Sequence, residues 1–333
     1  MVQTYEQSNV TVNTVTLAFL NYNTTNDLIH ALKSVKMAAK DINVNVVVID
    51  NGSTDNSVEI LKKEFPKLKI IELKQNFGFA KGFNHIFNFE ADYYFLLNSD
   101  IVLEPDSISK ILAIIKKDEK IGLAGVKMLR QDGSEQFSYG KMPNLISELT
   151  NRSCYQKLNK KNKTDDYFEV ESILGAVMIV PKITLQKVGP MDPRYFFFFE
   201  ETDWCYRIRK AGLKVVHIPN VSVVHIQGVS ANKVPIESRI EFHRSRKLFF
   251  KTHYGKISEY ILNFGIVIRL IINSFSYLLL NVVTLALIPK FKNKFILYIN
   301  VFAWYCLGCS ENMGMHKPNK TEIENEKQNY NFI

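Results

Sequence analysis

The first 115 residues alternate short apolar stretches with amphipathic ones, and this alternation limits the folds open to the chain more than any other feature. Apolar runs of strand length lie at 14–21, 44–50, 68–73 and 93–97. Helical patterns lie at about 26–39, 53–65, after the glycine-rich run 76–84, and from Pro105. Strands that alternate with helices build a largely parallel sheet in an α/β domain. Two further strands are expected at 121–129 and 170–180, with long polar loops between them.

Charge and cysteine content limit the partners and the compartment. Lys and Arg exceed Asp and Glu by nine in 333 residues, so we expect anionic partners such as phosphates, nucleic acid or an acidic membrane. Four scattered cysteines do not make a disulfide framework and fit a reducing cytosol. The first 13 residues lack the basic and apolar parts of a signal peptide, which predicts a chain that is not exported.

The first two strands end in polar residues, at the edge where open α/β sheets bind ligands. Strand 14–21 ends in Asn21, and strand 44–50 ends in Asp50. The Asp50 carboxylate could accept a hydrogen bond from the imide N–H of a pyrimidine. Taken alone, Asp50 is explained more simply as an aspartate in a tight turn before a helix.

A glycine-rich run, NFGFAKGFN, follows the third strand. Its glycines, of which Gly78 is the first, permit close approach of the backbone to a ligand. Asn76 opens the run, and Lys81 could meet a phosphate. An ordinary turn explains these residues as well as a binding loop does.

The fourth strand leads into Asn98, Ser99 and Asp100. A divalent cation that bridges a diphosphate needs hard oxygen ligands, and Asp100 offers a carboxylate. His225 closes a later apolar strand and becomes a ligand only if the fold brings it to Asp100. The simpler alternatives are a polar turn and a structural histidine.

Four consecutive phenylalanines, 196–199, precede Glu200, Glu201 and Asp203. Acids in the first turn of a helix complement its dipole, and this explains them about as well as catalysis does. The apolar run nevertheless sets them beside apolar surface, where a carboxylate could take a proton from an acceptor hydroxyl. We therefore expect a pocket with an aromatic wall and an acidic floor.

The joint order of these motifs resembles the family 2 glycosyltransferases, most closely their bacterial rhamnosyltransferase-like branch, over about residues 14–254. The motifs are FLNYN, VVVIDNGSTDNS, NFGFAKGFN, FLLNSDIVLEPDSI, GAVMIVPKITLQKVGPMDPRYFFFFEETDWCYRIRKAGLKV and VVHIQGVS. The resemblance implies the GT-A fold, an α/β sandwich with a mostly parallel sheet flanked by helices. It also implies transfer of a sugar, with inversion, from a nucleoside diphosphate donor, with dTDP-rhamnose preferred and UDP-hexoses as the alternative.

The resemblance also implies roles for the residues at the strand ends. Asp50 corresponds to the base-binding aspartate and Asp100 to the metal-binding aspartate of an Asp-x-Asp motif. Asn98 replaces the first aspartate of that motif, which weakens the site for Mg²⁺ or Mn²⁺. His225 matches a histidine that completes this site in some relatives. The implied donor-binding set is Asn21, Asp50, Asn76, Gly78, Lys81, Asn98, Ser99 and Asp100.

For the acceptor side, Glu201 aligns with the catalytic base of the family, which is usually an aspartate one methylene shorter. Glu200 is the neighbouring alternative, and Asp203 is expected to orient the helix or the acceptor. Phe199 and Trp204 would form the wall of the acceptor pocket. The implied acceptor is a saccharide or a lipid-linked saccharide of cell-surface polysaccharide synthesis.

The composition changes after about residue 256. Residues 270–288 carry no charge and are just long enough to span a bilayer, and 295–307 are again apolar. Five polar residues recur at near-helical spacing, which favours a helix that lies in the membrane interface over one that crosses it. These are Arg269, Asn273, Tyr277, Asn281 and Thr284. The basic run 237–256, with Arg244, is expected to meet an anionic lipid or lipid diphosphate rather than nucleic acid.

We therefore predict a transferase domain at 1–255, with a donor part at about 14–128 and an acceptor part at about 129–255. A membrane-association region at 256–310 and a disordered polar tail at 311–333 would follow, on the cytosolic face of the membrane. Homo-oligomers are compatible with the sequence. One rival is a sugar nucleotidyltransferase, although FLNYNTTND lacks the glycine-rich, basic loop expected after the first strand. The other is a non-catalytic membrane adaptor that keeps the fold.

Overall fold

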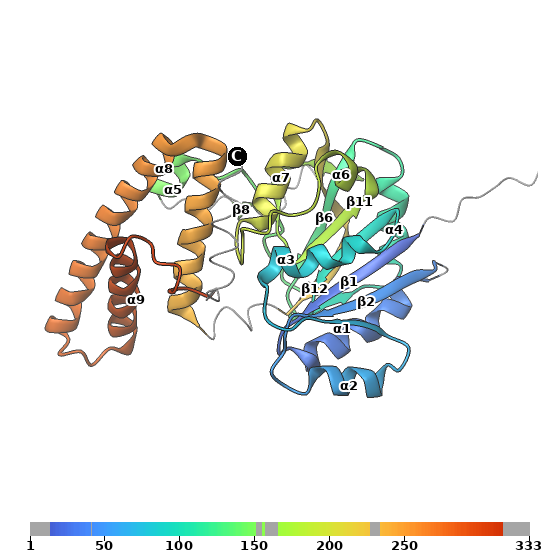
Figure 1. Ribbon diagram of the computed structural model, residues 1–333, viewed down its shortest axis with the longest axis horizontal. Helices are drawn as coiled ribbons and strands as arrows, with labels where there is room; N and C mark the ends of the chain where they lie inside the picture. The colour runs from blue at the N-terminus through green and yellow to red at the C-terminus, as the bar shows by residue number, and fades with distance from the viewer. Residues whose placement is uncertain (1–13, 41, 151–154, 157–165, 227–233, 316–333) are drawn as a thin grey trace, which may run out of the picture.

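The structure, a computed structural model, describes residues 14–40, 42–150, 155–156, 166–226 and 234–315. A mixed β-sheet forms the centre of its first domain. Nine strands of these residues form the sheet (Figure 1). Eight of them follow the spatial order β3 (Lys69–Glu72), β2 (Val44–Asp50), β1 (Val15–Asn21), β4 (Tyr93–Asn98), β11 (Val177–Pro181), β6 (Ile121–Leu129), β12 (Lys214–His225) and β5 (Ile101–Leu103), and β9 (Phe168–Glu169) pairs with β12.

The parallel half of the sheet brings polar strand ends to one edge. β3, β2, β1 and β4 pair in parallel, and Asn21 lies opposite Asp50 in register. Asn98 lies opposite Leu20 on the other side of β1. The helices that connect these strands are α1 (Thr25–Ala38), α2 (Ser57–Glu64) and α3 (Gly78–Asn84), which runs into the 3₁₀ turn η1 (His85–Asn88). The sequence predicts these elements to within a few residues, although α3 begins inside the glycine-rich run.

The other half of the sheet differs from the expected parallel arrangement. β11 runs antiparallel to both β4 and β6, whereas β6 and β12 are parallel to each other. The strand expected at 170–180 is two strands, because β10 (Ser172–Ile173) belongs to a small sheet with β7 (Tyr139–Gly140) and β8 (Tyr155–Gln156). Gly175 lies between β10 and β11, where a side chain would contact Phe79 and Glu201.

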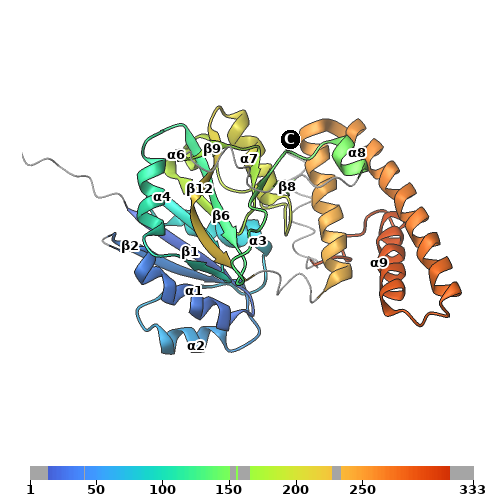
Figure 2. The ribbon, with the colours of Figure 1, turned by 180° about the vertical axis from the view of Figure 1, so that it is seen from behind.

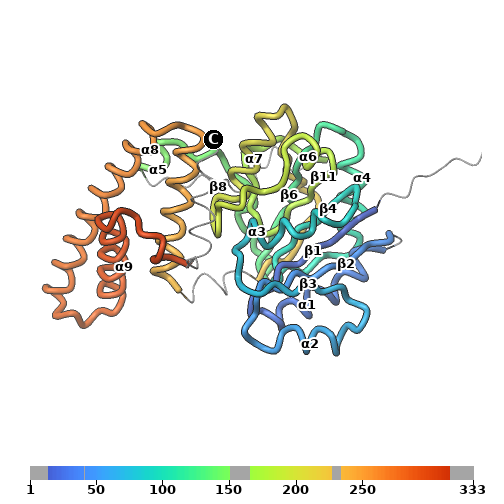
Figure 3. Tube along the Cα trace, in the orientation of Figure 1, coloured from blue at the N-terminus to red at the C-terminus, as the bar shows by residue number. Residues whose placement is uncertain are grey.

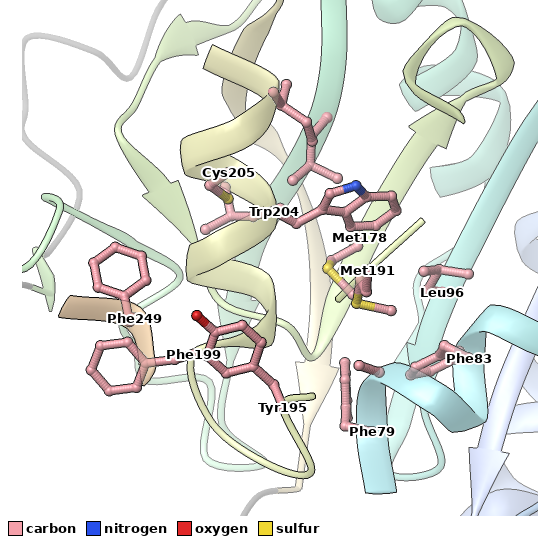
Figure 4. Packing of buried hydrophobic residues seen from close by; sticks show 14 of the residues in the cluster. Phe79, Phe83, Leu96, Met178, Met191, Tyr195, Phe199, Trp204, Cys205 and Phe249 are labelled. Carbon is pink, nitrogen blue, oxygen red and sulfur yellow. The ribbon is translucent and has the colours of Figure 1, made fainter. Parts of the chain in front are cut away.

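Helices cover both faces of the sheet, and each face has its own cluster of buried apolar residues. Helices α1 and α4 (Ser107–Ile115) contribute to one cluster. On the other face, α3 and α7 (Glu200–Lys210) contribute, and α6 (Lys182–Lys187) follows β11 (Figures 1 and 2). Figure 4 shows the second cluster, in which Trp204 of α7 lies with Met178, Met191 and Leu96.

A bent helical region follows the sheet domain. Helix α8 (Pro235–Val283) kinks at Gly255, whose φ is 83°, into a first arm (235–254) and a second arm (256–283). Helix α9 (Pro289–Cys306) returns alongside α8, and the short α5 (Leu145–Leu149) packs against α8 (Figures 1 and 3). The kink falls at the domain boundary expected near 255, which stays a prediction. Of the expected tail, 311–315 are described and 316–333 lie outside the described residues.

The polar stripe of the second arm meets neighbouring helices, with Tyr277 against α9 and Arg269 against α5. Its five residues are half-buried, and the Tyr277 ring lies 6.1 Å from that of Phe291 and 5.6 Å from that of Tyr298. The opposite side of the arm exposes large apolar side chains, among them Phe264 (70% exposed) and Phe275 (61% exposed). The stripe therefore meets neighbouring helices, and the expectation that this arm lies in the membrane interface stays a prediction.

Candidate active site

The Asp50 carboxylate is held in a fixed orientation at the end of β2. It is buried, and its Oδ1 accepts hydrogen bonds from Asn21 Nδ2 at 2.8 Å and from Ser53 Oγ at 2.6 Å. The backbone N–H of Ser53 donates to Oδ2 at 3.0 Å. The register of β1 and β2 thus joins Asn21 and Asp50, two residues that the sequence assigns to donor binding.

Asn51, which sequence reasoning missed, fixes the glycine-rich turn. Its Nδ2 donates to Asn76 Oδ1 and to the Gly78 carbonyl, each at 3.0 Å, and its Oδ1 accepts from the Phe77 N–H at 2.9 Å. Gly78 has a φ of 79°, and a Cβ there would lie 2.3 Å from the Phe196 carbonyl oxygen. Only glycine fits at this point, where the turn touches the phenylalanine run. Asn51 directly follows Asp50 at the end of a strand, and this position could have marked it as a candidate site residue.

Lys81 lies on α3, with its Nζ 5.6 Å from the centre of the Phe77 ring. Ser99, after β4, accepts a hydrogen bond from Thr24 Oγ1 at 2.7 Å, and the Asn98 N–H donates to the Ala176 carbonyl at 3.0 Å. These contacts set all three residues near the strand-end edge. Their roles toward a donor stay predictions.

Asp100 and His225 lie together, as the metal hypothesis requires. Antiparallel pairing of β5 and β12 sets His225 opposite Ile101, and His225 Nε2 lies 3.5 Å from Asp100 Oδ1. Burial lowers the pKa of His225, although the nearby charge of Asp100 acts in the opposite direction. The neutral ring that this favours is the form that binds metals.

Gln136 sets the tautomer of that ring, and no sequence pattern pointed to this residue. Its Nε2 donates to the His225 carbonyl at 2.7 Å, so its Oε1 is the atom 2.9 Å from His225 Nδ1. Because an amide oxygen only accepts, Nδ1 must carry the proton and Nε2 must present its lone pair toward Asp100.

The lone pair of His225 and the carboxylate of Asp100 fit a divalent cation as two of its ligands. Among the described residues, no set of three His, Cys, Asp or Glu side chains suits a metal. Phosphate oxygens and water commonly complete such a coordination sphere.

Two buried glutamates open α7. Glu200 and Glu201 are 4% and 6% exposed. Burial raises the pKa of Glu201 to about 7, against hydrogen bonds that lower it. Burial, and then the charge on Glu201, raise the pKa of Glu200 well above its usual range. Among the described atoms, Glu200 Oε2 has no hydrogen-bond partner. Burial thus favours the protonated forms of both carboxyls, and the pKa of Glu201 lies close to neutral pH.

Asp203 ties α7 to α8. Its Oδ2 accepts from Arg207 Nε at 2.7 Å, and its Oδ1 lies 2.7 Å from His253 Nε2. Trp204 is fully buried and donates from Nε1 to the Gly189 carbonyl at 3.0 Å. We correct the expectation that Trp204 lines an acceptor pocket, because its ring belongs to the core.

The phenylalanine run joins α7 to α8 rather than forming an open wall. Phe198 and Phe199 both have positive φ, 69° and 66°, a strained conformation for bulky residues. The Phe199 ring is buried and lies 5.4 Å from that of Phe242 and 5.5 Å from that of Phe249. An acceptor contact through this ring would require α8 to move.

Arg244 holds the segment after α9. Its Nη1 lies 2.5 Å from Glu241 Oε2, and its Nη2 donates to the carbonyls of Ser310, Glu311 and Met313. An acceptor would have to bind beside these hydrogen bonds, so the acceptor role of Arg244 stays a prediction.

Comparison with known proteins identifies the family of the part of the chain that holds the strand-end motifs. The family model "Glycosyl transferase family 2" matches residues 17–172, which contain the Asp50, Gly78 and Asp100 motifs. These residues form a family 2 glycosyltransferase domain. The enzyme class predicted from the order of the motifs is thereby confirmed.

The glycosyltransferase has relatives that are named rhamnosyltransferases. It is 24% identical over 233 residues to the N-acetylglucosaminyl-diphospho-decaprenol L-rhamnosyltransferase of Mycobacterium tuberculosis, covering 64% of this chain and 76% of that one. It is 25% identical over 220 residues to a dTDP-rhamnosyl transferase of Shigella flexneri, covering 63% of this chain and 71% of that one.

The fold of the glycosyltransferase also matches a solved structure. A crystal structure of GalNAc-T7 with UDP, GalNAc and Mn²⁺ superposes with a TM-score of 0.55 at 16% identity. The match covers 76% of this chain and 54% of that one, so this chain spans about half of its length. The expected GT-A fold is confirmed, with a mixed rather than mostly parallel sheet.

Proposed function

We propose that this glycosyltransferase moves a sugar, with inversion, from a nucleoside diphosphate donor to a saccharide or lipid-linked saccharide in bacterial cell-surface polysaccharide synthesis. dTDP-rhamnose is the preferred donor, on the names of the two relatives, and a UDP-hexose is the alternative. The observation that carries the proposal is the buried pair of carboxyls at the start of α7, where burial raises the pKa of Glu201 to about 7.

In the proposed reaction, the Glu201 carboxylate accepts the proton of an acceptor hydroxyl. The hydroxyl oxygen then forms a bond to the anomeric carbon while the bond from that carbon to the donor diphosphate breaks. A base works best when its pKa lies near the working pH, and burial puts Glu201 there. Burial raises the pKa of Glu200 as well, which favours its uncharged form and limits the negative charge of the site.

The strand-end residues would bind the donor. Asp50, oriented by Asn21 and Ser53, is suited to accept from the base, and the turn fixed by Asn51 lies next to the phenylalanine run. Asp100 and His225 would hold Mg²⁺ or Mn²⁺, which when bound would balance the negative charge of the departing diphosphate. Gln136 keeps the lone pair of His225 directed to that place.

We further propose that the second arm of α8 attaches the enzyme to the cytosolic face of a membrane without crossing it. By length and composition α8 is the one helix of the described residues that could span a bilayer. Support for attachment comes from the exposed apolar side of the arm, including Phe264 and Phe275, and from the exposed Lys290 and Lys292 just beyond its end.

Release of nucleoside diphosphate by the full chain tests the proposed reaction. dTDP-rhamnose and UDP-hexoses are supplied with Mg²⁺ or Mn²⁺, and Glu201→Gln serves as the inactive control. Release that depends on donor identity and is lost in the control supports the proposal. Release of pyrophosphate from a nucleoside triphosphate and a sugar phosphate would instead identify a nucleotidyltransferase. Absence of both binding and turnover for every donor would indicate an adaptor.

Vesicle sedimentation tests the membrane proposal. Phe264→Asp and Phe275→Asp together should release the chain from anionic vesicles, because both side chains are exposed and contribute to the apolar side of the arm. Met37→Asp, at a similarly exposed apolar residue of α1, is the matched control. Equal binding of both variants would refute attachment through the second arm.

A further inference from the structure

Three arginines gather where the two arms of α8 meet α5 and α9. Arg246 Nη1 lies 3.1 Å from Glu148 Oε2, and Arg269 Nη1 donates to the Glu148 carbonyl at 3.1 Å. The guanidinium carbons of Arg246 and Arg239 lie 5.4 and 5.5 Å from the centre of the Phe242 ring. We call Arg239, Arg246 and Arg269 the arginine cluster.

The arginine cluster carries more positive charge than its described neighbours balance. Glu148 is the carboxylate that pairs with it, and it pairs with Arg246. His243 Nδ1 accepts from Arg246 Nη2 at 2.7 Å and lies 3.1 Å from the Tyr305 hydroxyl. Burial, and then the charge on Arg246, lower the pKa of His243 well below its usual range, so this histidine adds no charge of its own.

Arg246 also has unused hydrogen-bonding capacity. Its side chain is 3% exposed, and its Nε has no partner among the described residues. A buried donor without a partner is costly, and an anion would satisfy it. Arg239, which also lies against the Phe242 ring, is exposed, so the cluster is open to solvent at that residue.

We propose that the arginine cluster binds the diphosphate of a lipid-linked acceptor. This deepens the proposed function and rests on it. Guanidinium groups match phosphate oxygens in both charge and geometry, and three of them suit a diphosphate.

The surroundings of the cluster agree with the layout of such an acceptor. The Phe242 ring contacts both the cluster and the rings of Phe198 and Phe199, which directly precede the catalytic glutamates. Arg269 lies on the second arm, whose other side exposes Phe264 and Phe275. The apolar arm, the arginines and the glutamates thus follow in the order of lipid tail, diphosphate and sugar hydroxyl.

A purely structural role for the arginine cluster would not require all three of its charges. The Arg246–Glu148 pair suffices to tie α5 to α8, and Arg269 reaches the α5 backbone as well. Arg239 is exposed and makes its described contact with the Phe242 ring, so its charge contributes little to the packing of these helices. Replacing Arg239 therefore separates ligand binding from folding.

Binding of the full chain to phosphatidylcholine vesicles that contain geranylgeranyl diphosphate tests the proposal. The assay contains a metal chelator and no donor, so that the donor site does not contribute. Arg239→Gln should weaken this binding about tenfold, since it removes one charge-assisted contact. Lys251→Gln, which removes an exposed charge from the same helix, is the matched control and should bind as the parent chain does.

Two further measurements distinguish the possible sources of the phosphate. Arg239→Gln and Lys251→Gln should bind equally well to vesicles that contain phosphatidylglycerol at the same total charge as the diphosphate vesicles. If both variants lose binding to the diphosphate vesicles equally, the proposal is overturned in favour of general attraction to anionic surfaces. An effect of Arg239→Gln on the affinity for free pyrophosphate, but none on vesicle binding, would assign the site to soluble phosphate and overturn it as well.

Donor hydrolysis separates this inference from the proposed function. Arg239→Gln should hydrolyse the donor at the parental rate, because Arg239 lies outside the donor site. If the parent chain hydrolyses no donor, the proposed function fails, whereas the vesicle experiment still reports on the arginine cluster.

Discussion

Glu201→Gln tests the proposed chemistry most directly, because glutamine keeps the shape of the side chain and loses the ability to take a proton. The side chain is buried against Gly175 and near Thr202, contacts that an amide of the same size can keep. General-base catalysis is worth about 10²–10⁴-fold, or roughly 3–5 kcal/mol of barrier. We expect kcat to fall by that factor while the dissociation constant of the donor stays nearly constant.

The dependence of kcat on pH gives a second readout from the same site. Burial raises the pKa of Glu201 to about 7, and the base works only when ionised. In the parent enzyme kcat should therefore reach a plateau above neutral pH and fall by about tenfold for each unit below it. Glu201→Gln should lose this dependence. Glu200→Gln should keep it, with kcat within a few-fold, because glutamine resembles the protonated carboxyl that burial favours there.

Release of nucleoside diphosphate across the neutral pH range measures both effects, with donor affinity from a separate titration. A parental kcat in Glu201→Gln together with an inactive Glu200→Gln would move the base by one residue. Parental rates in both variants would refute the reasoning, since neither buried carboxyl would then take the proton.

Three more predictions concern the residues around this pair. Asp203→Asn should lower the free energy of unfolding by about 1–3 kcal/mol, measured by denaturant titration, and should change kcat little; a large loss of kcat at unchanged stability would contradict its role in joining α7 to α8. Gly78→Ala should cost about 1–3 kcal/mol of stability and weaken donor binding, because the new Cβ would overlap the Phe196 carbonyl at a positive φ. Gln136→Leu should lower Mn²⁺ affinity by about 10–100-fold, read by electron paramagnetic resonance, since His225 loses the partner that fixes its tautomer; unchanged Mn²⁺ binding in this variant would refute the metal role of His225.

Sequence patterns were sufficient to predict the parallel half of the fold and most of the polar strand-end edge. Apolar runs of strand length alternate with helical patterns, and this local periodicity is sufficient to predict β1 to β4 and their helices. Parallel strands end at the same edge, so the polar residues after them, Asn21, Asp50 and Asn98, could be expected together. The glutamates at the start of α7 could also be picked out as candidate site residues, because acids directly after an apolar run are unusual.

Tertiary structure alone decided which groups meet across long sequence distances. The antiparallel insertion of β11 and the pairing of β5 with β12 bring Asp100 to His225. Gln136 bonds to both the backbone carbonyl and the ring Nδ1 of His225. No local pattern encodes these contacts, because they depend on the order of strands in the sheet.

The environment of the phenylalanine run and of the polar stripe was likewise decided by packing. The phenylalanine run looked like a pocket wall in sequence, yet Phe199 is buried against Phe242 of α8. The spacing of the polar stripe predicted that its residues share one side of the second arm, but not that Tyr277 of that side packs on Tyr298 of α9. Periodicity shows which residues of a helix share a side, but only the neighbouring helix determines what that side meets.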